Sequence, residues 1–567
     1  MKRNFIKIPV LALGLILSVA TLNSCVKDDE VSVTEPTRYT SDDVQSYGDL
    51  FKVFWTTMDQ RYNYFYEQKE RGGMDWNAIY REYYPKFAAL KTYKKGAEFS
   101  DNDILEDRKK AIQYFTDIID PIIDRHFGFA VLLPLSKGSG NTQVNFSGGM
   151  KSKPANVYGF APKYNYMRTR LTDVVTQSIR VSTTSVFTYL MGNLQSNPDI
   201  YYISYNQFAL YATQINLKDK YLTPNPVDNY VLTTAEIDKA PELSAIKDVN
   251  ARNKARDFTV NVLNQWNAFF NSADVKSFND QVTEFKNTEV VSDAFVNLSK
   301  TLLAKSQSLV AYGSKSTYSS VLTNDTDTDT DKYITWFMDR MKSHVESGYS
   351  LAQFQTDAKN IEIRSPFYQK FLNPLRKGSI KKLIIDVRGN GGGAVIDFRY
   401  FVERLVTKNT VWGYQRTKEG NGQFNYTPWI PMQAKPHQFG IPANIPIAIL
   451  TDKGSYSMSE MSTMMLKSQG SQVVSVGDFS AGATAGLTPN PDEFNGGSQD
   501  AIANVMQFYM PVMATKDMNG QVIEGIGVKP DHYVTPPTDA EVAAMTSSPS
   551  TFVDRVVNEA IKYLSSK

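Results

Sequence analysis

Leu383–Gly393 reads LIIDVRGNGGG, a hydrophobic strand that ends in a glycine-rich turn. About seventy residues later, Gly454–Glu460 reads GSYSMSE and follows a second hydrophobic run, Ile445–Leu450. A glycine turn exposes main-chain N–H groups that can hold an oxyanion. A serine where a strand turns into a helix exposes its hydroxyl beside the positive end of that helix. Each pattern alone is common, but together they predict two parts of a serine hydrolase site.

The chain around these motifs alternates strands and helices from Ile380 onward. Because apolar strands that alternate with helices are typical of a helix-covered parallel sheet, this part predicts an α/β fold with a mostly parallel sheet. The expected strands are 382–387, 445–450 and 473–476, and the expected helices are 395–406 and 459–468.

Upstream of the α/β core the pattern changes three times. Helical spacing dominates 46–127, where Asp75-Trp76 resembles a helix start. Short β-rich runs broken by Gly, Ser and Asn dominate 128–215, and helical patterns dominate 216–376. With a core at 377–538 and a helical tail at 539–567, the 42% hydrophobic composition predicts a large globular protein of several domains.

Four motifs, in order, carry a resemblance to a known family. They are DRHF at Asp124–Phe127, DVRGNGGG, the S-x-S-x-S-E cluster, and EGIGVKPD at Glu524–Asp531. The chain resembles the S41 peptidases, the C-terminal processing and tricorn-like serine proteases. The resemblance implies a crotonase- or ClpP-like core, a helical N-terminal segment with a DW pair, and a PDZ-like domain at 128–215. No convincing carboxylate-binding loop of the PDZ type is found there.

Aligned on the family's S-x-S-E block, Ser457 is the expected nucleophile. Ser455 and Ser459 are the alternatives, and Ser459 is also a plausible N-cap of the following helix. A serine hydroxyl needs a base to take its proton. In the processing-protease branch that base is a lysine, but Ala483 occupies its position here. An alanine cannot act as a base, which leaves either a different base or an inactive enzyme.

The tricorn-like branch uses a histidine, which makes His126 the expected general base. None of the other three histidines lies in a comparable motif. The resemblance gives Glu524 the role of orienting the base through a serine, but that serine is replaced here by Arg125. The alternatives are a structural turn residue at 126 and an exposed carboxylate at 524.

The expected oxyanion donors are the main-chain N–H of Met458 and that of Gly393 or Gly392. Asp386 and Arg388 are expected to pin the glycine turn rather than to act in the chemistry. The resemblance implies no metal and no organic cofactor.

The N-terminus predicts a lipoprotein signal at 1–24. A basic start and an apolar run precede Leu22–Cys25, which resembles a lipobox, and a polar tether follows over 25–45. Cys25 is the only cysteine, so no internal disulfide can account for it. Acylation of Cys25 would anchor the chain to a membrane. Asp28–Glu30 resembles the export signal of surface lipoproteins in Bacteroidetes, or is a solvated linker. The expected location is the outer membrane, facing the periplasm or the cell surface.

The balance of basic and acidic residues limits the classes of binding partner. Three of 61 basic residues precede Cys25, so 58 remain against 59 acidic ones, and no basic patch indicates nucleic-acid binding. The expected partner is a peptide or protein substrate, and no oligomeric state follows from the sequence. The rival hypothesis is a peptide- or ligand-binding surface lipoprotein on the same scaffold without turnover.

Overall fold

A computed structural model describes residues 38–149, 158–225, 229–314, 316–318, 328–484, 497–511 and 513–567. The predicted signal peptide and Cys25 lie outside these ranges. The chain divides into two compact units. The first combines the N-terminal residues with 416–429 and 496–514, and the second contains the rest of the chain from Ser152.

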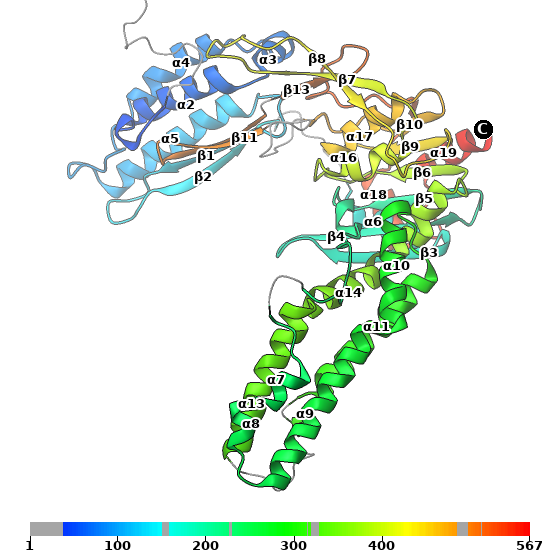
Figure 1. Cartoon of the computed structure of the whole chain (residues 1–567). Coiled ribbons are helices and arrows are strands. Elements are labelled where there is room, and N and C mark those ends of the chain that lie inside the picture. The colour runs from blue at the N-terminus through cyan, green and yellow to red at the C-terminus, as the bar shows by residue number, and fades with distance from the viewer. Residues whose placement is uncertain are drawn as a thin grey trace, which may run out of the picture. The chain divides into compact units, whose positions relative to one another are not determined.

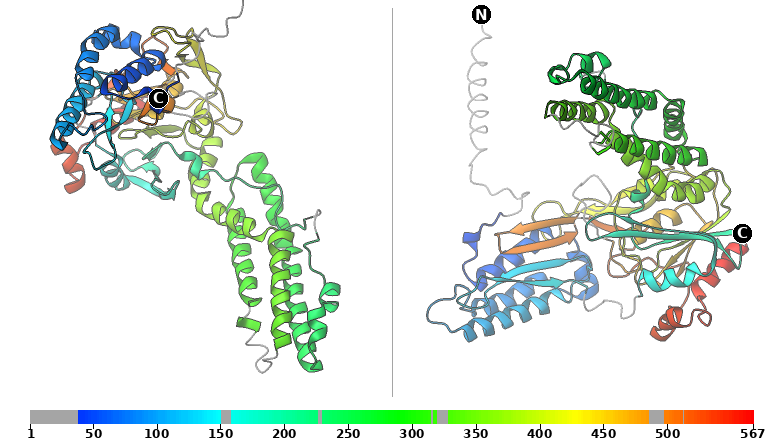
Figure 2. Two further views of the ribbon diagram at one scale, coloured as in Figure 1. Left: turned by 90° about the vertical axis from the view of Figure 1, so that its left-hand side faces the viewer. Right: turned by 90° about the horizontal axis from the view of Figure 1, so that it is seen from below.

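The first unit joins N-terminal helices to a four-stranded sheet in the order β11-β12-β1-β2. Neighbouring strands are antiparallel, and Phe129 in β1 pairs with Phe508 in β12 and Phe146 in β2. Figure 2 shows β11 and β12, drawn in orange, beside strands from the other end of the chain. The elements are η1 Ser41–Asp43, α2 Tyr47–Arg61, α3 Phe65–Gly72, α4 Trp76–Ala88, α5 Asp101–Ile119, β1 Gly128–Leu133, β2 Thr142–Ser147, β11 Gly497–Ile502 and β12 Met506–Pro511.

Aromatic packing holds the helices of the first unit on this sheet. The Phe54 ring lies 5.2 Å from Phe115, 4.7 Å from Phe129 and 5.9 Å from Phe508 between centroids. Asp75 caps α4 as predicted, because its carboxylate accepts a hydrogen bond from the Ala78 amide. The predicted helical N-terminal region is confirmed.

The second unit is built on a seven-stranded sheet in the order β14-β10-β9-β6-β5-β4-β3. The pairs from β14 to β5 are parallel, and β4 and β3 extend the sheet antiparallel. This confirms the predicted α/β class with a mostly parallel sheet. The strands are β3 Leu171–Arg180, β4 Val186–Leu194, β5 Ile200–Tyr205, β6 Lys382–Asp386, β9 Ile447–Thr451, β10 Val473–Gly477 and β14 His532–Tyr533.

A long helical segment forms the crossover between the adjacent parallel strands β5 and β6, and its long helices run side by side in Figure 1. Its elements are η3 Leu210–Thr213, α7 Thr234–Asp238, α8 Pro241–Ala245, α9 Val249–Phe270, α10 Ala273–Thr288, α11 Asp293–Tyr312, α13 Thr328–Ser343, η4 His344–Gly348, α14 Leu351–Phe367, η5 Tyr368–Leu372 and α15 Asn373–Arg376. The segment predicted as mainly helical is therefore a crossover connection, which parallel strands require.

The remaining elements cover the seven-stranded sheet or form a third, three-stranded sheet in the order β13-β7-β8. They are α6 Phe160–Arg168, α16 Asp397–Tyr400, η6 Val402–Leu405, β7 Thr410–Thr417, β8 Ile430–Ala434, α17 Met458–Lys467, β13 Met513–Lys516, α18 Asp539–Ser547 and α19 Arg555–Ser565. None of the helices in the described ranges is long and apolar enough to cross a bilayer.

Two predicted segments differ from the structure. The strands expected as one β-rich region over 128–215 divide between the two units. The sequence did not predict this division, because periodicity reveals a strand but not the strand with which it pairs. The helix expected over 395–406 is broken into α16 and η6. The Arg404 side chain donates to the Tyr400 carbonyl (2.6 Å), the acceptor that an unbroken helix would offer to the Arg404 amide.

Candidate active site

Ser457 lies at a strained turn between β9 and α17. Its φ of 52° and ψ of −114° are rare for a residue with a side chain. It immediately precedes the first residue of α17, at the positive end of the helix dipole. Strained serines at strand-to-helix turns are typical of nucleophiles, because the turn lifts the hydroxyl out of the surrounding main chain.

The two rival serines have hydroxyls that are already engaged. Ser455 donates to the Val387 carbonyl (2.8 Å), and Ser459 donates to the Asn390 carbonyl (2.9 Å). Within the described residues the Ser457 hydroxyl donates no hydrogen bond. The side chains of Ser455 and Ser459 therefore fasten the serine turn to the strand β6 and its glycine turn, whereas no described residue accepts the proton of the Ser457 hydroxyl.

The glycine turn contacts the serine turn. A Cβ added to Gly392 would lie 2.6 Å from the Ser457 Cβ and 3.0 Å from the Met458 nitrogen. The Gly392 amide donates to the Asn390 side-chain oxygen (2.9 Å). The amides of Gly393 and Met458, in contrast, donate no hydrogen bond within the part of the chain that the structure describes. Of the three predicted oxyanion donors, these two retain an available N–H.

A buried ionic cluster lies behind the glycine turn. The Arg388 guanidinium binds Asp386 (2.7 Å) and Asp554 (2.8 Å), and Lys163 also binds Asp386 (3.2 Å). Burial alone would raise the pKa of Asp386, but the charges of Arg388 and Lys163 outweigh it and hold this pKa below its usual value. Asp386 and Arg388 therefore support the turn from the core.

Glu460 holds the serine turn against the loop that follows β10. Its fully buried carboxylate accepts hydrogen bonds from the Ser480 hydroxyl (2.7 Å) and from the amides of Gly482 (2.6 Å), Ala483 (2.8 Å) and Ser457 (3.1 Å). Burial raises the pKa of Glu460, and the four donors oppose that rise. The carboxylate is thus shared between the serine's own main chain and the neighbouring loop.

Ala483 lies directly beside the serine turn, where its carbonyl accepts the Ser457 amide (2.8 Å). Thr484 follows it and donates from its amide (2.9 Å) and its hydroxyl (3.3 Å) to Glu524. Glu524 is fully buried and is not an exposed loop carboxylate. The predicted nucleophile, oxyanion donors and acid all belong to the second unit, and no lysine side chain stands at position 483.

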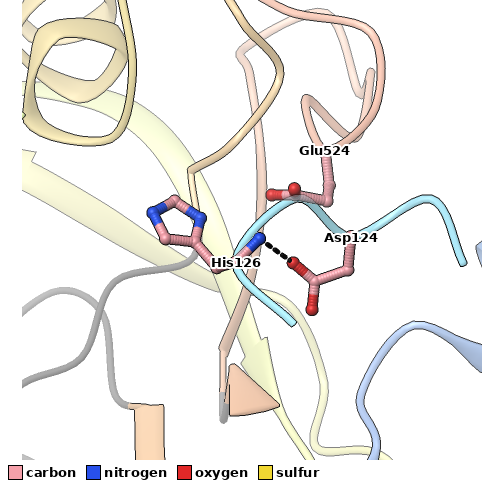
Figure 3. Close-up of side chains that lie close together, drawn as sticks. All are labelled: Asp124, His126 and Glu524. Carbon is pink, nitrogen blue, oxygen red and sulfur yellow. Dashed lines mark hydrogen bonds between the residues drawn. The ribbon is translucent and has the colours of Figure 1, made fainter. Parts of the chain in front are cut away.

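His126 belongs to the first unit, two residues before the start of β1. Its amide donates to the Asp124 carboxylate (2.8 Å; Figure 3). Burial lowers the pKa of His126 to about 4 and raises that of Asp124 to about 7. Among the described residues, the buried His126 Nδ1 and the Asp124 Oδ2 have no hydrogen-bond partner. The imidazole is therefore neutral at neutral pH and retains a lone pair.

A serine at a strained helix N-terminus, beside two available amides, is the arrangement typical of α/β acyl-transfer enzymes. Residues 351–534 match the model of peptidase family S41. The carboxy-terminal processing protease CtpB of Bacillus subtilis (strain 168) is 36% identical over 115 residues, which cover 20% of this chain and 22% of the relative. This chain thus matches about a fifth of that relative's length.

Two solved structures align over most of the chain. One, from Parabacteroides merdae ATCC 43184, is 15% identical with a TM-score of 0.44 and covers 92% of this chain and 97% of its own. Mature CPAF is 9% identical with a TM-score of 0.39, over 92% of this chain and 98% of its own.

Three supporting residues were missed at the level of sequence. Glu460 was visible in the S-x-S-E motif, and Asn390 in DVRGN, but neither motif reveals what the side chain binds. Thr484, which holds Glu524, carries no signal in a single sequence.

Proposed function

We propose that this chain is a serine peptidase in which Ser457 attacks the carbonyl of a peptide bond. The observation that carries the proposal is the strained Ser457 turn with the available amides of Gly393 and Met458 beside it. Those two amides would stabilise the oxyanion of the tetrahedral intermediate. Water would then hydrolyse the acyl-enzyme and release the second product.

His126 is the proposed base. It would take the proton of the Ser457 hydroxyl and return it to the leaving amine. Two observations support this choice: position 483 offers no basic side chain, and burial holds the pKa of His126 at about 4, which keeps the imidazole neutral. Glu524 would favour the imidazolium that forms during proton transfer. The mechanism requires the imidazole to come within hydrogen-bond distance of the Ser457 hydroxyl.

A fluorophosphonate probe tests the nucleophile directly. We expect the probe to label the purified chain at Ser457, as found by peptide mass analysis, and to block hydrolysis of a denatured protein substrate. Ser455→Ala and Ser459→Ala are matched controls, which should still be labelled. A folded wild type that is neither labelled nor hydrolytic would instead favour the peptide-binding lipoprotein without turnover.

Anchoring is a separate proposal, which rests on the sequence around Cys25. Diacylglycerol on Cys25 would tether the peptidase to the outer membrane, facing the periplasm or the cell surface. Cys25→Ser should move the protein from the membrane fraction to the soluble fraction without changing its peptidase activity. A wild type that incorporates no fatty-acid probe during growth would contradict this proposal.

A further inference from the structure

The orientation of the Gly393 amide is set by a segment at the start of the helical crossover. The Phe208 amide donates to the Gly392 carbonyl (2.7 Å), and the Ala394 amide donates to the Phe208 carbonyl (2.8 Å). Phe208 and Gly393 thus form an isolated parallel bridge. In a trans peptide the C=O and the next N–H point in opposite directions. Because the Gly392 carbonyl faces Phe208, the Gly393 N–H faces away from Phe208.

Only glycine fits this arrangement. Gly393 has a φ of 146°, and a Cβ added there would collide with the carbonyl oxygen of Phe208. The preceding residue, Gly392, also lies close to the serine turn, because a Cβ added there would lie 2.6 Å from the Ser457 Cβ. The glycine turn is therefore in close contact with both the Phe208 segment and the Ser457 turn, and a shift of either would reorient the oxyanion donor.

Asp397 fastens the Phe208 segment. Its carboxylate accepts the amides of Leu210 (2.7 Å) and Tyr211 (2.7 Å), while its own amide donates to the Ala394 carbonyl (3.2 Å). Asp397 thus bonds to the main chain on both sides of the Phe208–Gly393 bridge. Its side chain is fully buried and makes no ion pair within the described residues, although unpaired buried carboxylates are costly.

We propose that Asp397 is a positioning residue for the oxyanion donor: it fixes residues 208–211, which in turn hold the Gly393 amide in its orientation. Asp397 does not touch the substrate. The inference rests on the proposed function, because it assigns a role in stabilising the oxyanion that Ser457 would create. Loss of one oxyanion donor costs about 100- to 1,000-fold in kcat. A donor that is only misoriented should lower kcat less than a donor that is removed.

Asp397→Asn is the test variant, since asparagine keeps the shape but leaves one of the two amides facing an NH2 group. We expect kcat to fall by about 10- to 100-fold while KM changes by less than about threefold. A peptide trifluoromethyl ketone, which forms an oxyanion on Ser457, should lose affinity by the same factor as kcat. A cleaved product peptide, which forms none, should bind as tightly as it binds the wild type.

Asp357→Asn is the matched control. Asp357 is also a buried carboxylate of the second unit with two side-chain donors, Tyr221 (2.7 Å) and Gln353 (2.7 Å), but it makes no bond to the glycine turn. The Asp357→Asn variant should have lower thermal stability than the wild type, with unchanged kcat and unchanged affinity for the ketone. If Asp397→Asn does not fold, Tyr211→Pro removes one of the same two amides from a partly exposed turn and should lower kcat in the same direction.

The outcomes separate this inference from the proposed function. Wild-type hydrolysis and probe labelling at Ser457 establish the function whatever Asp397 does. If the function holds but a folded Asp397→Asn variant keeps its kcat and its ketone affinity, the inference is overturned. An equal loss of ketone and product affinity would also overturn it, because that pattern indicates general disruption of the site.

Discussion

The turns that carry Ser457 and His126 are built in opposite ways. The serine turn is clamped: Glu460 binds four donors, and Ser455 and Ser459 bind carbonyls near the glycine turn. In the histidine turn the Asp124 carboxylate accepts the His126 amide (2.8 Å), whereas the His126 Nδ1 has no partner within the described residues. The geometry is fixed at the proposed nucleophile and oxyanion donors, and an unused hydrogen-bonding nitrogen remains at the proposed base.

The largest effect should come from removing either half of the proposed pair. His126→Ala and Ser457→Ala should each lower kcat/KM by roughly 10⁴- to 10⁶-fold, because each leaves its partner unable to act. The double variant should be little worse than either single one. Steady-state hydrolysis of a fluorogenic peptide measures all three.

The control for this pair is His532→Ala, since His532 contacts Glu559 (3.3 Å) at the edge strand β14. It should retain wild-type kcat/KM. Full activity in a folded His126→Ala variant would exclude the histidine base and direct attention to a lysine, with Lys467 the first to test.

A smaller effect should follow from loosening the clamp. Glu460→Gln keeps one carbonyl oxygen but turns an NH2 group toward amides that need an acceptor. We expect a loss of about 1–3 kcal/mol in the free energy of unfolding and a fall in kcat of about 10- to 100-fold. Chemical denaturation and steady-state kinetics measure the two quantities.

Glu289→Gln is the comparison for that loss of stability, because Glu289 pairs with Arg404 elsewhere in the second unit. It should destabilise the protein without lowering kcat. If Glu460→Gln also left kcat unchanged, the contrast between a clamped serine turn and an imidazole with an unpartnered nitrogen would have no catalytic meaning.

How much of the structure could be predicted from the sequence depends on the kind of interaction. The strands at 382–387, 445–450 and 473–476 are confirmed within one or two residues as β6, β9 and β10, because continuous apolar runs identify buried strands. The contact between Gly392 and Ser457 was also expected, since turns that follow neighbouring parallel strands meet at one edge of the sheet. The roles of Ser457, His126 and Glu524 stay predictions.

The contacts that the sequence did not reveal are long-range and made by the main chain. Asp397 binds amides of residues 210 and 211, more than 180 positions away in the chain, and no local pattern encodes such a partner. For the same reason, the strands of 128–215 could be seen but not assigned to a sheet. Local periodicity identifies elements, whereas their partners depend on the tertiary fold.

Restoring the family's lysine should have little benefit. Ala483 is buried and lies between Glu460 and the Ser457 amide, so the ammonium group of Ala483→Lys would have to be desolvated next to a fully used carboxylate. We expect no gain in kcat/KM and a loss of about 2 kcal/mol or more in unfolding free energy. Ala483→Met, with similar bulk and no charge, separates crowding from charge. A gain in activity for the lysine variant alone would show that the serine turn can still accept a lysine base.

The smallest expected change is that of kcat/KM with pH, which should be nearly constant around neutrality. A histidine base works only when neutral, so activity is lost as pH falls through its pKa. At its ordinary pKa of 6.5, His126 would be about one-quarter neutral at pH 6, and the rate would already have fallen about fourfold. Burial lowers the pKa of His126 to about 4, so kcat/KM should change by less than twofold between pH 6 and 8 and fall about tenfold per unit only below pH 4. The unfolding temperature, recorded at each pH, distinguishes titration from unfolding.

Burial also raises the pKa of Asp124 to about 7, and Asp124→Asn tests whether that carboxyl adds a second change in kcat/KM near neutral pH. A half-maximal rate near pH 6.5 that persists in Asp124→Asn would mean that His126 is exposed to solvent in the working enzyme.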